Sequence, residues 1–333
     1  MVTEDARDNR ERDADDIDAP LRGVAGNPQL SGHRSLEEEA ARISKRVREI
    51  NEQVNKRSGR NLASAIAIAI VLVIAVFSSL LIDKRWFIIL GVAMVGVVVL
   101  ELSTAMRTAG HRIPRIPSML VAFAVVPAAF YLGMAWQWAA LIVGTTAVLL
   151  CRLLQTLWER PRPNARQLGN DATSIIFVQL YATFIGSFSA LLVAQPGGEY
   201  WTLAFIIIVV CVDTGAYASG LKFGKHKLAP KISPGKTWEG TIGGTLLATI
   251  AAILLCVFLL ELPWWFGLIM GVAIAVTATC GDLTESMVKR SLGIKDMSNW
   301  LPGHGGFFDR LDSMLPSGAM AFALYFWAAP LIS

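Results

Sequence analysis

The stretch from Ser286 to Asp312 carries the densest group of residues suited to phosphate chemistry. It combines side chains of both charges, one imidazole and the glycine-rich run PGHGG; the residues concerned are Lys289, Arg290, Lys295, Asp296, His304, Asp309, Arg310 and Asp312. Arginine and lysine bind phosphate oxygens, carboxylates bind hard cations, and glycine lets the backbone approach a ligand closely. The mixture indicates a site for a polyphosphate and a metal ion.

Carboxylates recur at helical spacing on both sides of this stretch. Asp282 and Glu285 are three residues apart in ATCGDLTESMVKR, so one helix face would present both. Asp309 and Asp312 have the same spacing, and a helical turn would point both the same way. Mg²⁺ suits such a set, because it takes one or two carboxylates and leaves positions for water and phosphates. A single histidine and no thiolate cluster argue against zinc. The alternative is that these charges only form ion pairs with neighbouring Lys and Arg.

A second phosphate-binding candidate is the loop LKFGKHKLAPKISPGKTWEGTIGG. Its five lysines and one histidine predict a cationic mouth, and the compact turn SPGKTWEG leads into an apolar segment. Backbone N–H groups at a helix start with a nearby lysine suit phosphate oxygens, although the spacing is not that of a P-loop. We therefore expect Ser233, Lys236 and Thr237 to contact a triphosphate or a lipid phosphate, and the sequence does not decide between them.

Asp213 is the clearest ionisable residue within an apolar segment, in VVCVDTGAYASG. Such residues are costly in a bilayer and usually mark function. We expect Asp213 to shape the polar end of a lipid-accessible cavity; the alternative is a hydrogen bond to a neighbouring helix. Glu101, near the end of another apolar segment, is expected to lie at the membrane interface without a role.

The elements that must position these residues are apolar. With 54% apolar and 17% charged residues among 333, the composition is typical of an all-α polytopic membrane protein. About nine segments are long enough to cross a hydrocarbon core of roughly 30 Å as transmembrane helices. They lie at about 61–82, 86–103, 117–134, 136–154, 174–195, 201–220, 239–262, 264–282 and 313–332.

Basic residues sort onto one side of this arrangement. They fill the approach to the first segment and every second loop, whereas the opposite loops hold only Lys84 and Arg85. Lys and Arg favour the cytoplasmic side, so the N-terminus is expected to be cytoplasmic and the C-terminus outside. Residues 1–33 are expected to be disordered and without a cleavable secretory signal, 34–60 to form an amphipathic cytoplasmic helix, and 61–333 to form the transmembrane catalytic domain.

The motif around PGHGG resembles the signature of phosphatidate cytidylyltransferases, also called CDP-diacylglycerol synthases. The matching positions are Ser286, Val288, Lys289, Arg290, Lys295, Asp296, Ser298, Leu301, Pro302, His304, Gly305, Gly306, Phe307, Asp309, Arg310, Leu311 and Asp312. SPGKTWEG and VDTGAYASG also resemble family features, so the similarity covers about Phe205 to Ser313. It implies transfer of CMP from CTP to phosphatidate, giving CDP-diacylglycerol and pyrophosphate in phospholipid biosynthesis.

The resemblance implies roles for the motif residues. The expected catalytic residues are Asp282, Asp309, Lys289, Arg290, His304 and Arg310; the expected substrate-binding residues are Ser233, Lys236, Thr237, Lys295, Gly305, Gly306 and Asp213. Asp282 and Asp309 would be the principal Mg²⁺ ligands, Asp312 and Asp296 would be ligands or supporting groups, and a second cation, monovalent or divalent, fits as well.

The resemblance also implies an integral protein of a bacterial-type plasma membrane, with its active site facing the cytoplasm. Its partners would be CTP, phosphatidate and the lipid bilayer, with no nucleic acid, and a homodimer is compatible with it. A transporter or channel would share Asp213 and the basic loops but would not need the whole motif series. A headgroup transferase acting on CDP-diacylglycerol would show DGxxAR followed by GxxxDxxxD, which is absent. A transferase moving a sugar phosphate onto a polyprenyl phosphate is the other rival.

Overall fold

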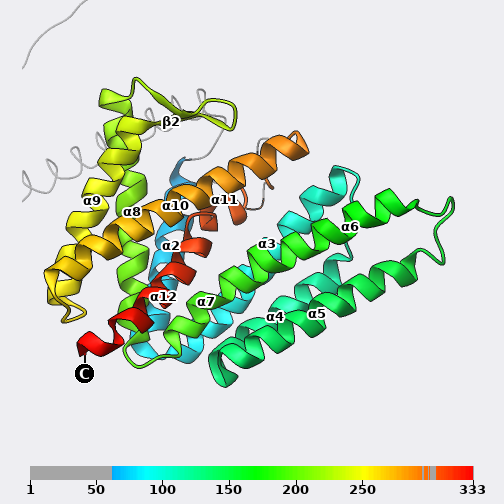
Figure 1. Ribbon diagram of the computed structural model, residues 1–333, viewed down its shortest axis with the longest axis horizontal. Coiled ribbons are helices and arrows are strands. Elements are labelled where there is room, and N and C mark those ends of the chain that lie inside the picture. Colours follow the sequence, from blue (N-terminus) through cyan, green and yellow to red (C-terminus); the bar gives the residue numbers. More distant parts are fainter. Residues whose placement is uncertain (1–61, 295, 299, 301–304, 333) are drawn as a thin grey trace, which may run out of the picture. The chain divides into compact units, whose positions relative to one another are not determined.

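The computed structural model describes residues 62–294, 296–298, 300 and 305–332, and these are mainly helical (Figure 1). The predicted segments 1–33 and 34–60, and the candidate residues Lys295 and His304, lie outside the described residues. The helices are α2 (Leu62–Ile82), α3 (Lys84–Thr108), α4 (Arg115–Leu132), α5 (Met134–Gln155), α6 (Ala165–Val178), the π-helix η1 (Gln179–Phe184), α7 (Ile185–Val193), α8 (Gly198–Phe223), α9 (Trp238–Phe258), α10 (Trp264–Leu292), α11 (Phe308–Leu311) and α12 (Met314–Ile332).

Among the described residues, seven helices are long and apolar enough to cross a membrane. They are α3, α4, α5, the continuous run Ala165–Val193, α8, α9 and α10. The prediction of a helical polytopic membrane protein is therefore confirmed. The difficult boundary between the third and fourth predicted segments is also right, because Gly133 alone separates α4 from α5, with a φ of 86° that favours glycine.

The main error in the predicted helix boundaries concerns α10. We expected this segment to end near residue 282, but the helix continues to Leu292 and ends at Gly293, whose φ is 69°. The first seven residues of the Ser286–Asp312 stretch are thus helical rather than loop. Glu285 and Lys289 consequently lie on the same helix face, one turn apart.

The SPGKTWEG segment, which we predicted to be a turn, forms the second strand of a β-hairpin and the start of α9. β1 (Lys227–Ala229) pairs antiparallel with β2 (Ser233–Thr237), with Lys227 opposite Thr237. The Glu239 carboxylate accepts hydrogen bonds from the backbone N–H groups of Lys225 and His226, and the nearest N–O separation is 3.1 Å. The strand pairing and the hydrogen bonds of Glu239 together fix the position of Lys236, which lies just before the start of α9.

Helices α8 and α9 pack closely through glycines. A Cβ on Gly244 would lie 2.6 Å from the carbonyl oxygen of Val212, and one on Gly215 would lie 3.0 Å from the carbonyl oxygen of Gly243. Small residues allow such close backbone approach between membrane helices. Because α8 carries Asp213 and the hairpin leads into α9, this packing sets the spacing between Asp213 and Lys236.

Replacing Gly244 with alanine should therefore push α8 and α9 apart. We expect a loss of about 1–3 kcal/mol in stability, because the added methyl meets rigid backbone. Thermal unfolding in detergent measures the loss. Gly169→Ala is the matched control, since a Cβ there meets nothing within 4 Å on the exposed face of α6. Equal unfolding temperatures for Gly244→Ala and the unmodified protein would contradict the argument.

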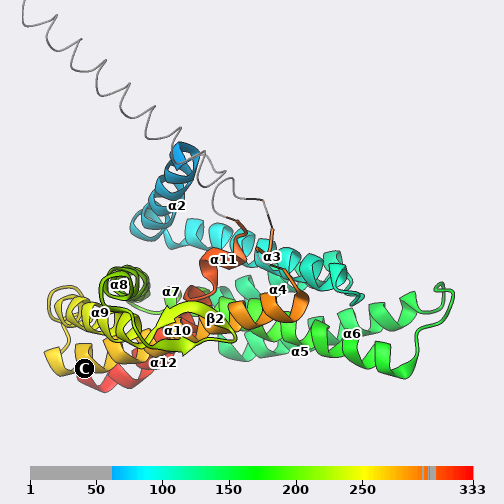
Figure 2. The same ribbon diagram turned by 90° about the horizontal axis from the view of Figure 1, so that it is seen from above.

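Two hydrophobic cores meet along α10. One core is built from α3, α4, α5 and the α6–α7 region, and the other from α8, α9, α10 and α12. Phe266, Met270 and Ile274 of α10 belong to the second core, whereas Val288, near the end of the same helix, belongs to the first. Both views place α10 and α12 between α8–α9 and α4–α6 (Figure 2). The candidate residues on α10 lie at this junction.

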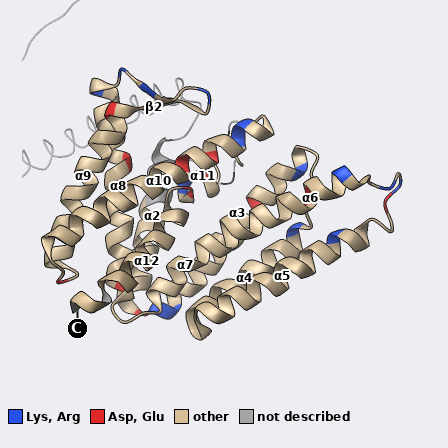
Figure 3. Cartoon of the chain, in the orientation of Figure 1, with Lys and Arg blue, Asp and Glu red and all other residues tan. Residues whose placement is uncertain are grey.

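Basic residues gather at particular ends of the helices. Figure 3 shows Lys and Arg at the β1–β2 hairpin, at the C-terminal end of α10, and at the loops joining α3 to α4 and α5 to α6. The opposite turn, between α2 and α3, holds Lys84, which pairs with Glu199 of α8 at 2.6 Å. The helix bodies between these ends are largely free of charge in the same view.

Candidate active site

Four carboxylates lie in two pairs between α10 and α11. Asp282 contacts Asp312, and Glu285 contacts Asp309, each pair within hydrogen-bonding distance. The single turn of α11 thus directs Asp309 and Asp312 toward the same helix, as their spacing predicted. Glu285 and Asp312 are each only 6% exposed. Two adjacent carboxylates repel unless a proton or a cation lies between them, so the arrangement favours cation binding.

Two lysines reach these carboxylates. Lys236 of the hairpin forms an ion pair with Asp282. Lys289 lies with its Nζ 2.5 Å from Oε1 of Glu285 and 3.4 Å from Oδ1 of Asp309. The predicted role of both lysines at the site is compatible with this placement, because an ammonium group beside the carboxylates is also available to phosphate oxygens.

The junction of α11 and α12 is pressed against α10. Ser313 Oγ donates to Oδ1 of Asp282 at 2.8 Å, and its backbone N–H donates to Oδ1 of Asp312 at 2.7 Å. A Cβ on Gly281 would lie 2.2 Å from the carbonyl oxygen of Asp312. Only glycine at position 281 permits this approach, which brings Asp282 and Asp312 together.

The pKa values of Asp309 in α11 and of its C-cap residue Asp312 shift in opposite directions. Burial, reinforced by the nearby Asp282, raises the pKa of Asp312 well above its ordinary value. Burial alone would also raise the pKa of Asp309, but hydrogen bonds from Glu285 and the Gly306 N–H, together with the Lys289 charge, hold it below its ordinary value. The ionised form is therefore favoured more at Asp309 than at Asp312, and a cation beside Asp312 would stabilise the ionised form of Asp312.

Glu101 of α3 anchors the glycine loop, although we expected it to have no role at the membrane interface. It is 1% exposed, and its carboxylate accepts from the backbone N–H groups of Phe307 at 3.0 Å and Phe308 at 2.8 Å, and from the Ser298 hydroxyl. These bonds tie both ends of the described loop to α3. No local sequence signal marks Glu101, because its partners lie some 200 residues away along the chain, 206 for Phe307.

The glycines of the loop permit this anchoring. Gly305 has a φ of 83°, and a Cβ there would lie 2.8 Å from Oδ2 of Asp309 and 3.8 Å from Oδ1 of Asp296. A Cβ on Gly306 would lie 3.0 Å from both carboxylate oxygens of Glu101. The Gly306 N–H donates to Oδ2 of Asp309 at 2.9 Å. Gly305, Gly306, Asp296 and Asp309 therefore lie close together.

Asp213 is brought to the site from α8. It lines a cavity of about 400 Å³ with Lys236, Thr237 and Gly235. It is also close enough to Asp282 and Arg310 to interact electrostatically. A Cβ on Gly235 would meet nothing within 4 Å, so the space above the hairpin is open beside Lys236. This cavity can admit a phosphate-bearing group beside Lys236, between the hairpin and α8.

Three other candidate residues lie in the hairpin or beside it. Arg290 donates from Nε to the carbonyl oxygen of Ile232 at 3.3 Å, so it supports the hairpin turn. Thr237 is the N-cap of α9, and its hydroxyl accepts from the Gly240 N–H at 3.1 Å. Ser233 opens β2 opposite Ala229. Ser233 and Thr237 are part of the hairpin, and Arg290 binds its turn. None of these contacts is with the four carboxylates.

The π-helix η1 contributes a residue that the sequence did not reveal. Tyr181 stacks on Phe177, with ring centroids 5.5 Å apart, and meets Phe308 of α11 edge-on at 5.9 Å. It lies near enough to Asp312 and Glu285 for electrostatic interaction. Single π-helical turns within α-helices frequently occur at functional sites. Here the widened turn carries Tyr181 under α11.

A metal ion is compatible with part of this donor set. No three acidic, histidine or cysteine side chains among the described residues are arranged as a metal-binding cluster. Mg²⁺ typically takes only one or two carboxylates and completes its coordination with water and phosphate oxygens. The adjacent Asp282 and Asp312 supply such a pair, and Asp282 already attracts the Lys236 ammonium. The side chains present therefore fit a hard divalent cation.

Comparisons with known proteins show the family of the chain. A family model described as the cytidylyltransferase family matches residues 63–328, and the chain belongs to this family. A phosphatidate cytidylyltransferase of Mycobacterium bovis is 36% identical over 280 residues, which cover 80% of this chain and 89% of the relative. One of Mycobacterium leprae is 33% identical, covering 87% and 95%. One of Pseudomonas aeruginosa is 51% identical over 131 residues, covering 38% and 47%.

Proposed function

We propose that the chain is a phosphatidate cytidylyltransferase that transfers CMP from CTP to phosphatidate, giving CDP-diacylglycerol and pyrophosphate in phospholipid biosynthesis. The observation that carries the proposal is the meeting of two carboxylate pairs with Lys236 and Lys289 at the end of membrane-spanning helices. Such a site suits a reaction between a soluble triphosphate and a phosphate anchored in lipid.

The reaction needs positioning rather than an enzyme nucleophile. A phosphate oxygen of phosphatidate attacks the α-phosphorus of CTP and forms the new P–O bond. The bond from the α-phosphorus to the bridging oxygen breaks, and its electron pair leaves with pyrophosphate. Gathering and aligning several negative charges is the main task of the protein in phosphoryl and nucleotidyl transfer.

The described residues divide this task among them. We expected Asp282 and Asp309 to be the principal ligands, but Asp312 is the carboxylate beside Asp282. Asp282 and Asp312 would therefore hold Mg²⁺, with Asp309 and Asp296 as further ligands or supporting groups, and a second cation is part of the proposal. A bound Mg²⁺ would neutralise charge on the phosphates and stabilise the charge that develops on the leaving pyrophosphate. Lys236 and Lys289 would hold phosphate oxygens, and Gly305 and Gly306 would let the backbone of the loop approach the nucleotide closely. His304 and Lys295 keep their proposed phosphate contacts.

The proposal includes an orientation in a bacterial plasma membrane. Nine helices would cross the bilayer, with the N-terminus and the active site on the cytoplasmic side and the C-terminus outside. The gathering of Lys and Arg at the hairpin and at the end of α10 supports this orientation (Figure 3). CTP is then on the correct side of the membrane. We further propose a homodimer.

Purified protein in detergent is expected to form CDP-diacylglycerol from CTP and phosphatidate only when Mg²⁺ is present. Product is measured by thin-layer chromatography with radiolabelled CTP, before and after chelation with EDTA and re-addition of Mg²⁺. The chelated enzyme should be inactive, because no cation at Asp282 and Asp312 would then neutralise the phosphates of the substrates. Intact, monodisperse protein that makes no product with Mg²⁺ would overturn the function, and an unchanged rate in EDTA would overturn the metal.

A further inference from the structure

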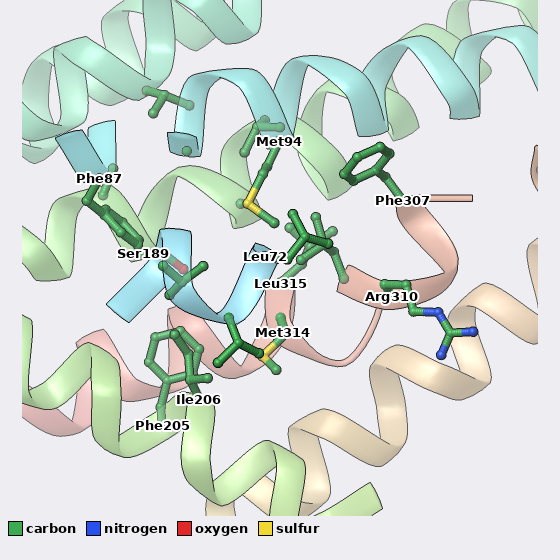
Figure 4. Close-up of a pocket in the computed structure, with 18 of the residues that line it drawn as sticks. Leu72, Phe87, Met94, Ser189, Phe205, Ile206, Phe307, Arg310, Met314 and Leu315 are labelled. Carbon is green, nitrogen blue, oxygen red and sulfur yellow. The ribbon is translucent and has the colours of Figure 1, made fainter. Parts of the chain in front are cut away.

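An apolar cavity of about 380 Å³ lies directly under the active site. Its walls come from α2, α3, α7, α8 and α12, and α11 closes one end. Nearly all lining side chains are apolar, Ser189 and Arg310 being the polar exceptions. Figure 4 shows Leu72, Met94, Ile206 and Leu315 around a common space. A nucleotide or a phosphate would lose its hydration there without compensation, so the cavity suits hydrocarbon.

The α11 segment separates the cavity from the catalytic residues and contacts both. Phe307 and Leu311 line the cavity, whereas Asp309 and Asp312 of the same short segment face α10. Arg310 lies at this end, and its guanidinium points away from the apolar space in Figure 4. A molecule with a phosphate at the carboxylates and lysines could therefore place an attached chain in the cavity without crossing the core.

The far end of the cavity lies deeper along the helices. Along α3 the lining residues run from Phe87 to Val95, which corresponds to roughly 12 Å of helix. Phe87 is near the start of α3 and Glu101 is beyond Val95, so depth increases with distance from the glycine loop. A lining that extends roughly 12 Å along α3 is long enough for part of an acyl chain.

Helix α2 forms the outer wall. Of the described elements it packs against α3 and α8. Val73 lines the cavity and is nevertheless 55% exposed, so the cavity reaches the surface of the chain beside α2. For a helix among membrane-spanning helices, that surface faces hydrocarbon. A lipid chain can reach the cavity from the bilayer without passing through water.

We propose that this cavity is an acyl slot, which holds one fatty acyl chain of phosphatidate while its phosphate lies at the carboxylate pairs. The inference rests on the proposed function and adds where the lipid tail is bound and what limits its size. Gly91 is the residue that limits the slot, because a Cβ there would have only Val126 Cγ1 near it, at 4.0 Å. A larger side chain at position 91 therefore grows into the slot instead of into backbone.

Filling the slot with Gly91→Leu tests the proposal by selectivity. We expect kcat/KM for dioleoyl phosphatidate to fall about tenfold, whereas the value for dihexanoyl phosphatidate changes less than about twofold. KM for CTP should not change, because Gly91 is far from the lysines and carboxylates in the fold. Gly169→Leu is the matched control, a helical glycine with nothing within 4 Å of its Cβ and outside the cavity. Equal losses for the two lipids, or no loss for either, would overturn the slot.

A second measurement does not depend on turnover. A phosphatidate with a diazirine near the end of one chain is irradiated with the detergent-purified full chain, without CTP, and the labelled peptides are mapped by mass spectrometry. Labels are expected on α3 near Phe87 and on α7 near Ser189, reduced about tenfold in Gly91→Leu but not in Gly169→Leu. Undiminished labelling in Gly91→Leu would overturn the slot. Labelling of the slot in protein that forms no CDP-diacylglycerol would overturn the proposed reaction and leave the lipid site supported.

Discussion

Asp282→Asn is expected to lower kcat by about 100- to 1000-fold while the protein remains folded. The substitution keeps the shape of the side chain but removes the charge that pairs with Lys236 and that would hold Mg²⁺ with Asp312. The side chain of Asp282 is 26% exposed, so the neutral amide is not stranded in the core. Initial rates over a range of Mg²⁺ concentrations measure the effect, and half-maximal activity should need more Mg²⁺ than in the unmodified enzyme.

The matched control is Asp83→Asn. Asp83 caps the N-terminus of α3 by accepting from the Arg85 N–H at 2.9 Å, and asparagine is an equally good cap. This variant should retain full activity, because it changes one aspartate outside the site. Near-normal turnover of Asp282→Asn at saturating Mg²⁺ would remove Asp282 from the metal site. The same assay on Asp309→Asn tells whether the second predicted principal ligand is also required.

Glu101→Gln is expected to reduce kcat/KM for CTP by about 10- to 100-fold, the range seen when groups that orient ligands are lost. The glutamine amide has one acceptor oxygen where the carboxylate has two, so the N–H of Phe307 or of Phe308 faces an NH₂ group. An unpaired buried donor costs about 1–3 kcal/mol, which either loosens the glycine loop or shifts α11. Thermal unfolding and CTP kinetics are measured on the same preparation.

Glu199→Gln is the control that distinguishes a specific effect of Glu101 on CTP kinetics from the loss of stability expected when any largely buried carboxylate is replaced. Glu199 is also largely buried and pairs with Lys84, but it lies at the start of α8, away from the glycine loop. Its substitution should lower stability without changing KM for CTP. If Glu101→Gln showed the same pattern, with reduced stability and unchanged kinetics, Glu101 would have no part in positioning the loop.

The local part of the site could be predicted because it obeys helical spacing. Asp282 and Glu285 are one turn apart, and both lie on the face of α10 toward α11. Asp309 and Asp312 are also one turn apart, and both face α10. Hydrophobic length likewise predicted the membrane helices. The continuation of α10 to Leu292 was missed because charged residues resemble a loop once a segment leaves hydrocarbon, although they are good helix formers.

The remainder depends on long-range packing that a single sequence does not encode locally. Glu101 resembles any acid near the end of an apolar segment, and its importance comes from partners more than 190 residues away, 197 for Ser298. Tyr181 is directed to the site by a π-helical turn without a sequence signature. Arg290 matches the family motif, but its side chain donates a hydrogen bond to the carbonyl oxygen of Ile232 in the hairpin turn, a contact that the sequence does not reveal.

The bonds from Glu101 to the glycine loop also bear on the order of synthesis. Helix α3 is made early, whereas Phe307 and Phe308 are made only after nearly the whole chain, 206 and 207 residues later. Until then a carboxylate lies in the first core without its native donors. Contacts of such long separation form late in folding. A chain cut short before the loop would retain most of its membrane helices but would leave the Glu101 carboxylate in the core without these donors, which destabilises the truncated protein.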